Sequence, residues 1–539
     1  MLLTRRHLLG AVPAAGLTAL PTWAGETAPF QPTWDSLAAG YRTPDWFRDA
    51  KLGLWAHWGP QCVPEVGDWY GRFMYMQGHR MYDHHVKTYG HPSQTGFMEI
   101  IGRWKAENWN PADLMGRYQR AGARYVVAMA QHHDNFDCFD SRWHGWNATR
   151  VGPKRDIVGI WERLARRAGL RFGLSNHGAH AWHWFQTAYG YDPEGPEAGI
   201  RYDAHRLTRT DGKGTWWNGL DPQELYGGPM LVPPAGIGSI RGMEDWHDAH
   251  TGPWLETPPP GNPAFVKSWY LRALDAIGKY RPDLVYFDNY GLPFGQVGLD
   301  VVAHYYNLSR QWHGGRMEVV ANGKRLATQT QRKAIVEDHE RSFVDDIRPD
   351  PWQTCTCIGQ WHYDRPLYER GGYKSLRQVV QSLTDIVSKN GNLLLSVPLR
   401  GDGSLDDLEI RFLDGLAAWT ATNGEAIFAT RPWRRYGEGP TRFTQDEARQ
   451  APFTAADLRF TTAGGHLYIL AMEWPADGRL LVTSLAGDAQ GIVDRIDLLG
   501  RDGAPLPFSQ TGSALEITLP DRPNDTPMLA LRLTGRGLV

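Results

Sequence analysis

The sequence predicts an α/β protein: a (β/α)8-type barrel followed by a C-terminal β-sandwich. Short apolar runs alternate with helical patterns from about residue 52 to residue 420, which is the order of a barrel of parallel strands. After about Arg431 the chain changes to short β-rich runs separated by Gly, Asp and Pro. At 539 residues the chain is also too long for one small core.

Eight apolar runs are strand candidates because each is short and bounded by polar or turn-forming residues. They are Leu52–Trp58, Arg124–Ala130, Arg171–Asn176, Leu284–Asn289, Glu318–Gly323, Lys333–Asp338, Thr354–Gln360 and Asn392–Pro398. Between them, apolar residues recur at helical spacing, as at Ile157, Trp161 and Leu164. Barrel enzymes carry their active site at the C-terminal ends of the strands, so polar residues at those ends are the catalytic candidates.

The chain divides into three expected parts. Residues 1–24 contain Arg5 and Arg6, an apolar stretch and a small-residue site, which together indicate a twin-arginine export signal. Residues 25–430 form the predicted barrel, in which 189–263, rich in Gly and Pro, is a long insertion. Residues 431–539 form the predicted sandwich. We therefore expect an exported protein, periplasmic or extracellular.

Composition narrows the class of ligand. The net charge of -2 disfavours a nucleic-acid partner, which requires a basic face. No window beyond the export signal has the length of about 18 apolar residues that a membrane span needs. The chain contains 24 Trp, 22 Tyr and 18 Phe, and flat aromatic faces suit a carbohydrate ligand. The oligomeric state stays open, with a homo-oligomer among the options.

Two carboxylates end separate predicted strands. Asp288 follows four apolar or aromatic residues, and Glu337 lies near the end of the sixth predicted strand. Two carboxylates that converge on one barrel mouth are what glycoside hydrolysis needs. Asp338 and Glu340 lie close to Glu337 in the chain, so the choice among these three acids stays open.

Histidines follow the first two predicted strands. His57, His132 and His133 are expected to hydrogen-bond to sugar hydroxyls. A metal-dependent hydrolase that uses the adjacent pair His132 and His133 is the alternative. Adjacent residues on a regular strand point to opposite sides, however, so we predict neither a metal site nor a cofactor.

Taken together, these motifs resemble the α-L-fucosidases of glycoside hydrolase family 29 over almost the whole mature length. The matching stretches are Trp46–Gly59, Gln131–Phe136, Lys154–Val158, Asp288-Asn289 and Val387–Val397. The resemblance implies a metal-independent barrel enzyme that removes terminal α-L-fucose from fucosylated oligosaccharides or glycoconjugates with retention of configuration. A glycan-binding protein on an inactive scaffold, or a glycosidase for a related deoxy or galacto-configured sugar, are the alternatives.

The resemblance also implies roles for individual residues. Asp288 matches the family nucleophile and Glu337 its acid/base. The expected substrate-binding residues are His57, Asp68, Trp69, Tyr70, His132, His133, Tyr286, Lys324 and Trp361.

Several positions depart from the family pattern. Asp68 stands where the family usually has Glu, and Tyr286 stands where it usually has Trp. Lys324 stands where Arg is common, and an ammonium cannot make the bidentate hydrogen bonds of a guanidinium. Ser175-Asn176-His177 stands where Tyr-Tyr-Ser is common. These changes surround the pocket, so they leave the reaction type alone and put the preferred substrate in question. Trp361 is a candidate for contact with the methyl group of fucose.

Overall fold

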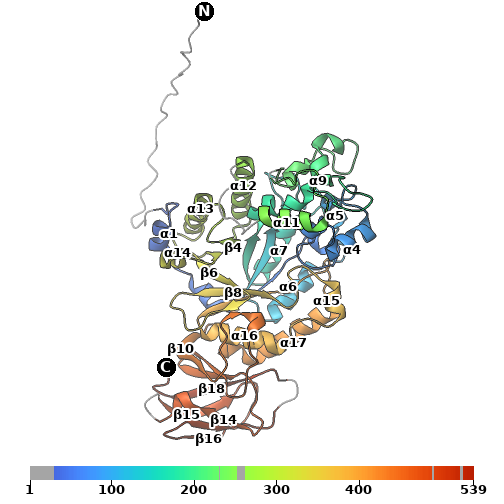
Figure 1. Cartoon of the computed structure of the whole chain (residues 1–539). Coiled ribbons are helices and arrows are strands. Elements are labelled where there is room, and N and C mark those ends of the chain that lie inside the picture. Colours follow the sequence, from blue (N-terminus) through green and yellow to red (C-terminus); the bar gives the residue numbers. More distant parts are fainter. Residues whose placement is uncertain (1–28, 230, 252–260, 488–490, 523–525) are drawn as a thin grey trace, which may run out of the picture.

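The computed structural model describes residues 29–229, 231–251, 261–487, 491–522 and 526–539 (Figure 1). The predicted export signal, residues 1–24, lies outside these ranges. Among the helices within them, none combines the length and the apolar character needed to cross a membrane.

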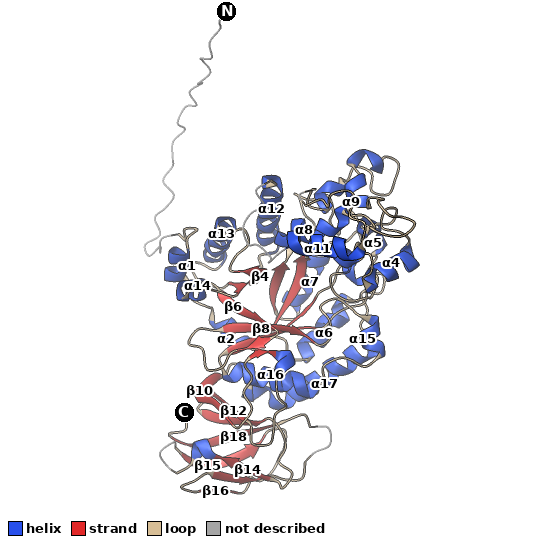
Figure 2. Cartoon of the chain, in the orientation of Figure 1, coloured by secondary structure: helices blue, strands red, loops and turns tan. Residues whose placement is uncertain are grey.

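The core of the protein is a closed barrel of eight parallel strands, which confirms the predicted fold class (Figure 2). Each strand is hydrogen-bonded to two neighbours, and β1 closes the ring by pairing with both β2 and β9. In order around the barrel, the strands are β1 (Leu52–Ala56), β2 (Tyr125–Gln131), β3 (Arg171–Asn176), β4 (Leu284–Tyr290), β5 (Val320–Lys324), β6 (Val336–Glu340), β8 (Trp352–Cys357) and β9 (Gly391–Ser396).

Helices join most of these strands in the βα order that the periodicity predicts. The connecting helices are α6 (Pro111–Arg120), α7 (Ile157–Arg167), α12 (Pro263–Tyr280), α13 (Gln296–Trp312), α14 (Gln329–Ala334) and α16 (Leu376–Ser388), and α17 (Asp407–Asn423) follows the last strand. Their apolar faces are buried against the barrel, as Trp161 of α7 and Trp269 of α12 illustrate. The connection from β6 to β8 instead contains the two-residue strand β7 (Ser342–Phe343).

The sixth strand starts later in the chain than the sequence predicts. Residues 329–334 form α14, which Thr328 and Gln331 begin with a capping box, each side chain accepting from the other residue's backbone N–H. The strand β6 therefore runs from Val336 to Glu340, two residues beyond the predicted end. This shift decides which acidic side chain of the segment reaches the mouth of the barrel.

Further short helices surround the barrel, and some of them cover its mouth on one side. They are α1 (Trp34–Gly40), α2 (Asp45–Ala50), α3 (Tyr70–Phe73), α4 (Arg80–Tyr89), α5 (Phe97–Arg103), α8 (Ala181–Trp184), α9 (Asp203–Arg206), α10 (Pro222–Leu225), α11 (Ile240–Thr251) and α15 (Arg365–Glu369). The segment before β2 and the segment before β4 meet there, with α4 and α5 beside α9 and α11 in Figure 1. Tyr75 donates to Asp203 at 2.8 Å, and His91 Nε2 lies 3.0 Å from Asp192.

The C-terminal part contains antiparallel sheets. One sheet has the order β10-β12-β13-β18-β15 and a smaller one β14-β17-β16. Their strands are β10 (Arg431–Glu438), β12 (Leu458–Ala463), β13 (His466–Ala471), β14 (Arg479–Val482), β15 (Ile492–Leu498), β16 (Phe508–Gln510), β17 (Leu515–Thr518) and β18 (Leu529–Arg536). The apolar side chains of both sheets share one core, which includes Phe460, Leu480 and Leu531.

Several contacts join the C-terminal sheets to the barrel, and two of them involve the segments directly after β6 and at the end of α16. Strand β11 (Gln445–Asp446) pairs with β7, directly after β6. In the second contact Asp385 of α16 accepts from Lys389 Nζ at 2.8 Å and from Arg459 Nε of β12 at 2.7 Å, and all three side chains are buried. A buried carboxylate between two cations is stable only while all the partners are present.

Replacing Asp385 by Asn should therefore destabilise the protein strongly. The substitution leaves two buried cations without a counter-charge, and we expect a loss of about 3–5 kcal/mol in the free energy of unfolding. Chemical denaturation measures it. Asp407→Asn is the control, because Asp407 pairs with Arg411 at 2.7 Å on the exposed surface of α17, where solvent screens the pair and little loss of stability is expected. Equal losses would contradict the prediction.

Candidate active site

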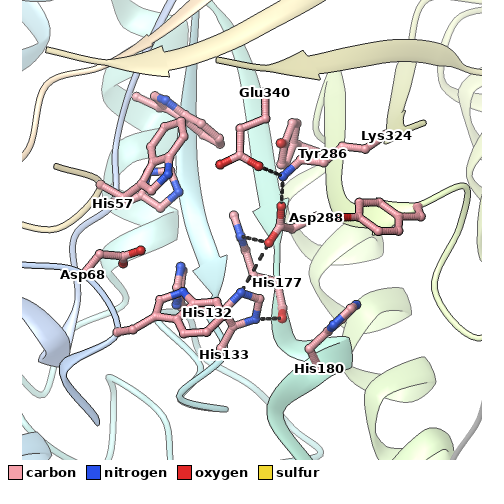
Figure 3. A pocket seen from close by; sticks show the side chains of 14 residues that line it. His57, Asp68, His132, His133, His177, His180, Tyr286, Asp288, Lys324 and Glu340 are labelled. Atoms are coloured by element: carbon pink, nitrogen blue, oxygen red, sulfur yellow. Dashed lines mark hydrogen bonds and ion pairs between the residues drawn. The ribbon is translucent and has the colours of Figure 1, made fainter. Parts of the chain in front are cut away.

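One pocket opens at the C-terminal ends of the barrel strands (Figure 3). It has a volume of about 250 Å³. Its lining combines histidines, carboxylates, a lysine and aromatic rings, and nearly every member lies in or directly after a barrel strand or the loop that follows it. The lining residues are Trp55, His57, Asp68, Trp69, His132, His133, His177, His180, Tyr286, Asp288, Tyr290, Lys324, Glu340 and Trp361.

Asp288 lies at the centre of a network of charges in this pocket. Its Oδ1 contacts Lys324 Nζ, and its Oδ2 lies 3.2 Å from His177 Nδ1 and 3.3 Å from His133 Nε2. These three partners come from β5, from the end of β3 and from the loop after β2. The carboxylate is therefore fixed in position from both sides (Figure 3).

The surroundings of Asp288 keep it ionised. Burial alone would raise the pKa of this carboxyl, but the Lys324 ammonium, His177 and hydrogen bonds from His133 and His177 lower it well below its usual range. Burial would likewise lower the pKa of Lys324, but Asp288 and Glu340 raise it well above its usual value. Both members of the pair are thus charged at neutral pH.

Glu340 is the second carboxylate of the pocket. It is the last residue of β6, and its Oε2 lies 2.6 Å from Lys324 Nζ. The Glu340 side chain is 39% exposed and that of Asp288 17% exposed, so Glu340 is nearer the open side of the pocket. One ammonium therefore holds two carboxylates, one deeper and one closer to solvent.

Glu337, predicted as the acid/base, does not line this pocket. Its carboxylate accepts from the Leu326 N–H at 3.0 Å and from Arg332 Nε at 3.1 Å, on a separate cavity outside the barrel. Side chains alternate along a strand, so Glu337 points away from the face that carries Glu340. Its pKa is lowered, because hydrogen bonds and charges of His339 and Arg332 outweigh the effect of burial. Its position outside the pocket and its lowered pKa both argue against Glu337 as the acid/base.

Asp338 points into the barrel but lies below the pocket. It accepts from Gln353 Nε2 at 2.8 Å, from Cys355 Sγ at 3.0 Å and from the Tyr286 hydroxyl at 3.2 Å. Burial raises its pKa. With its acceptor positions filled by barrel side chains, Asp338 supports Tyr286, which lines the pocket floor.

The predicted histidines His57, His132 and His133 all line the pocket, as does Asp68. Asp68 Oδ1 lies 2.5 Å from His362 Nδ1, a buried histidine behind the wall. Burial lowers the pKa of His57, with His177 and His362 adding to the effect, and burial also lowers that of His132. Neutral imidazoles can both donate to and accept from sugar hydroxyls.

The aromatic residues divide between wall and core. Trp69, Trp361 and Tyr286 line the pocket as predicted. Tyr70 does not: it is fully buried, and its hydroxyl lies 2.8 Å from His85 Nδ1. Trp69 has a left-handed backbone with φ 63, which turns the chain so that the next side chain points into the core. The prediction of Tyr70 as a pocket residue is therefore wrong.

Comparison with known proteins identifies the family. A family model described as alpha-L-fucosidase matches residues 19–425, well over half of the chain, and one described as alpha-L-fucosidase C-terminal domain matches residues 450–534.

The chain belongs to the α-L-fucosidase family. Tissue alpha-L-fucosidase of Rattus norvegicus is 25% identical over 522 residues, which cover 95% of this chain and 93% of the relative. Thermotoga maritima alpha-fucosidase in complex with a mechanism based inhibitor is 25% identical with a TM-score of 0.68, over 94% of this chain and 99% of that one. Its complex with fucose has a TM-score of 0.65 at 25% identity, over 94% and 100%. This α-L-fucosidase family member is thus a glycoside hydrolase.

Four pocket residues were not among the expected site residues of this fucosidase family member: Trp55, His177, His180 and Tyr290; Glu340 was expected only as an alternative to Glu337. His177 is the first residue after β3 and Glu340 the last of β6, so the rule that barrel sites lie at strand ends could have found both. Tyr290 ends β4 and is 42% exposed at the mouth. Trp55 lies within an apolar strand, where its sequence carries no signal of exposure.

Separate substitutions of Glu340 and Glu337 test which of the two carboxylates is the acid/base of the fucosidase. We expect Glu340→Gln to lower kcat on an unactivated fucoside about 100-fold or more, the usual effect of losing a proton-transfer group. Glu337→Gln removes a carboxylate that lies outside the pocket, and activity should stay near that of the unaltered enzyme. Steady-state kinetics on both variants provides the measurement. The reverse ranking would restore Glu337 as the acid/base.

Proposed function

We propose that this protein is an exo-acting, retaining α-L-fucosidase that releases terminal α-L-fucose from fucosylated glycans by double displacement. The observation that carries the proposal is the pair Asp288 and Glu340, two carboxylates that contact the same Lys324 ammonium in one pocket. Retaining glycosidases need two carboxyl groups about 5–5.5 Å apart, and a shared ammonium holds two carboxylates at a separation of that order.

In the first step, Asp288 attacks the anomeric carbon. The bond from that carbon to the leaving oxygen breaks, and the oxygen takes a proton from Glu340. The product is a fucosyl ester of Asp288 and a free alcohol. The low pKa of Asp288 suits this role, because the nucleophile has to be ionised before substrate binds.

In the second step, Glu340 acts as a base. Its carboxylate removes a proton from water, the oxygen of that water attacks the anomeric carbon, and the ester bond to Asp288 breaks. Asp288 leaves as a carboxylate and Glu340 is protonated again. Protonation removes the charge of Glu340 and weakens its attraction to Lys324, which then stabilises Asp288 alone. The partial exposure of Glu340 gives water and the leaving group access to it.

The lining of the pocket suits a deoxy sugar. His57, His132 and Asp68 provide hydrogen-bonding groups for hydroxyls, and Trp361, whose ring centroid lies 4.8 Å from that of His57, provides an apolar face for a methyl group. The Thermotoga maritima structure described above was determined in complex with fucose. A glycan-binding protein on an inactive scaffold would need neither carboxylate, and a single-turnover assay separates the two functions.

Removing the nucleophile should allow an external anion to replace it. Asp288→Gly should lose nearly all hydrolysis of an aryl α-L-fucoside, and added azide should restore turnover by attacking directly, which gives the β-configured fucosyl azide. Nuclear magnetic resonance of the product measures its configuration. Glu340→Gly serves as the matched control: its fucosyl ester still forms, so azide should give the α-configured product. Normal hydrolysis by Asp288→Gly would contradict the assignment.

Replacing Lys324 should move the acidic limb of the pH profile. Lys324→Met removes the cation that lowers the pKa of Asp288, so that pKa rises and the ionised form is lost at a higher pH. The acidic limb of kcat/KM for a nitrophenyl α-L-fucoside should therefore shift upward. Lys374→Met is the control, since Lys374 pairs with Glu447 at 2.8 Å outside the pocket. An unchanged limb in Lys324→Met would show that Lys324 does not set the charge of Asp288.

A further inference from the structure

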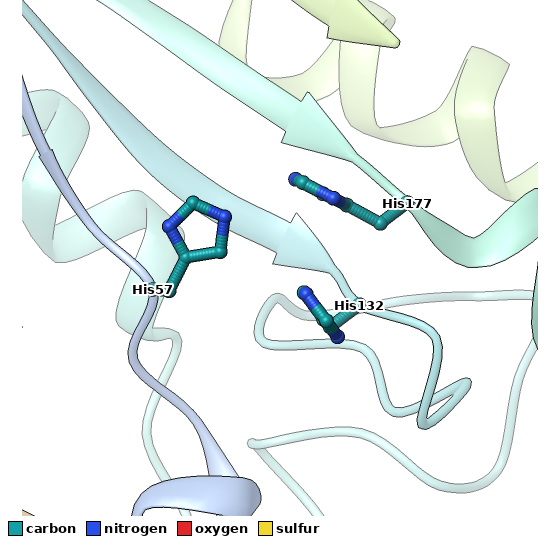
Figure 4. A group of neighbouring side chains, drawn as sticks. All are labelled: His57, His132 and His177. Carbon is teal, nitrogen blue, oxygen red and sulfur yellow. The ribbon is translucent and has the colours of Figure 1, made fainter. Parts of the chain in front are cut away.

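Three histidines meet at the floor of the pocket. His57, His132 and His177 are the first residues after β1, β2 and β3, three neighbouring strands of the barrel. Each is 3% exposed. Their ring centroids lie 5.7, 5.2 and 4.8 Å apart, and Figure 4 shows the rings pointing toward one another. Three strands thus place three imidazoles around one point.

These separations match three imidazoles on one metal ion. With zinc–nitrogen bonds of about 2.0–2.1 Å in a tetrahedral arrangement, ring centroids lie about 5.2 Å apart. In the structure, one ligand atom from each of the three residues lies within 4.8 Å of the others. Nitrogens on one tetrahedral ion are about 3.4 Å apart, so small rotations of the rings would complete the site.

The second nitrogen of each ring already has a partner. His57 Nδ1 lies 3.4 Å from Ser396 Oγ, His132 Nδ1 lies 2.8 Å from the side-chain amide of Gln61, and His177 Nδ1 lies 3.2 Å from Asp288 Oδ2. In each ring Nε2 is therefore the atom left for a ligand.

This arrangement is characteristic of histidines that bind metals. Such rings usually donate their other N–H to a carboxylate, carbonyl or similar group, which fixes their orientation. At His132 this requires the oxygen end of the Gln61 amide to face the ring, and an amide can present either end. Within the described residues, His177 Nε2 is buried and has no hydrogen-bond partner.

Two other groups of side chains in the same pocket have atoms that could bind a metal ion, but these atoms already contact other protein groups. In the group Asp68, His132 and His362, the Asp68 Oδ1 and His362 Nδ1 atoms contact each other at 2.5 Å. In the group His133, His177 and Asp288, the carboxylate contacts Lys324 and His133 Nδ1 lies 2.8 Å from the His177 carbonyl, to which it donates. A metal ion would have to displace these contacts in either group, whereas at His57, His132 and His177 it can bind the Nε2 atoms without displacing a contact of the Nδ1 atoms.

We propose that His57, His132 and His177 form a binding site for one divalent transition-metal ion, with Zn²⁺ the best match, and that the ion and the sugar exclude each other. Imidazole nitrogens favour Zn²⁺ over Mg²⁺ or Ca²⁺, and three of them leave a fourth position open to water. The nearby carboxylates Asp68, Asp288 and Glu340 outnumber Lys324, so the local charge favours a cation.

The exclusion follows from the shared residues. His57 and His132 would bind either the ion or the sugar hydroxyls, and an ion at their Nε2 atoms would fill the floor of the pocket. Zn²⁺ would thus act as a reversible inhibitor that competes with substrate. This exclusion rests on the proposed function, whereas metal binding itself does not.

Calorimetric titration of ZnCl2 into the chelator-treated protein tests the site without substrate. We expect one equivalent of Zn²⁺ to bind, and Co²⁺ to give the intense visible absorption of a tetrahedral nitrogen site. MgCl2 should show no binding, because Mg²⁺ prefers oxygen ligands. Absence of saturable Zn²⁺ binding, or equal binding of Mg²⁺, would overturn the proposal.

Three variants distinguish the three groups, since His57, His362 and His133 each belong to only one of them. His57→Gln should weaken Zn²⁺ binding by more than about 100-fold, the upper range for loss of a mere supporting partner. His362→Gln and His133→Gln are the matched controls and should keep the affinity. Thermal unfolding of each variant verifies that it is folded. Binding that survives His57→Gln, or is lost in either control, would overturn the assignment.

Competition then links the site to the sugar. L-fucose at saturating concentration should weaken Zn²⁺ binding, and Zn²⁺ should raise KM for an aryl fucoside while kcat stays constant. Zn²⁺ binding by a protein that lacks fucosidase activity would refute the proposed function and leave the metal site standing. Fucosidase activity without Zn²⁺ binding would refute only the metal site.

Discussion

The contact of Lys324 with Asp288 and Glu340 is the interaction on which the pocket depends. The three residues lie on β4, β5 and β6, which are consecutive in the barrel, and the register pairs Lys324 with Tyr290 on one side and Asp338 on the other. The buried ammonium offsets the repulsion between two carboxylates that face one cavity, and it keeps Asp288 ionised by lowering its pKa. Barrel closure thus fixes the charge of the site as well as its shape.

The lining is divided between two halves of the barrel. Strands β1–β3 are followed by His57, His132 and His177, which burial keeps neutral, whereas β4–β6 supply Lys324, Asp288 and Glu340. Asp288 joins the halves, since its two oxygens contact His177 and Lys324 respectively. A ligand bound at Nε2 of His177 would therefore change the environment of Asp288, because the opposite nitrogen of the same ring, Nδ1, contacts the Asp288 carboxylate.

Much of the barrel could be predicted from the sequence because buried parallel strands are short apolar runs, and Asp288 and His57 follow such runs directly. The acid of β6 could not, because its position depends on where that strand starts. A capping box at Thr328 and Gln331 starts a helix that takes up the first two residues of the predicted strand, and this shift decides between Glu337 and Glu340. The inward or outward direction of Tyr70 depends likewise on one left-handed residue, Trp69, which apolar periodicity does not reveal.

The pairing of β7 with β11 connects the C-terminal region to the backbone directly after Glu340. Glu340 is followed by Arg341, whose carbonyl accepts from the Glu447 N–H at 2.8 Å, and then by Ser342 and Phe343 of β7. Glu447 also accepts from Thr356 of β8. The backbone that positions one catalytic candidate is thus held by residues far along the chain. Cutting the chain between the two regions would consequently remove the backbone and side-chain contacts that hold the segment after Glu340 in place.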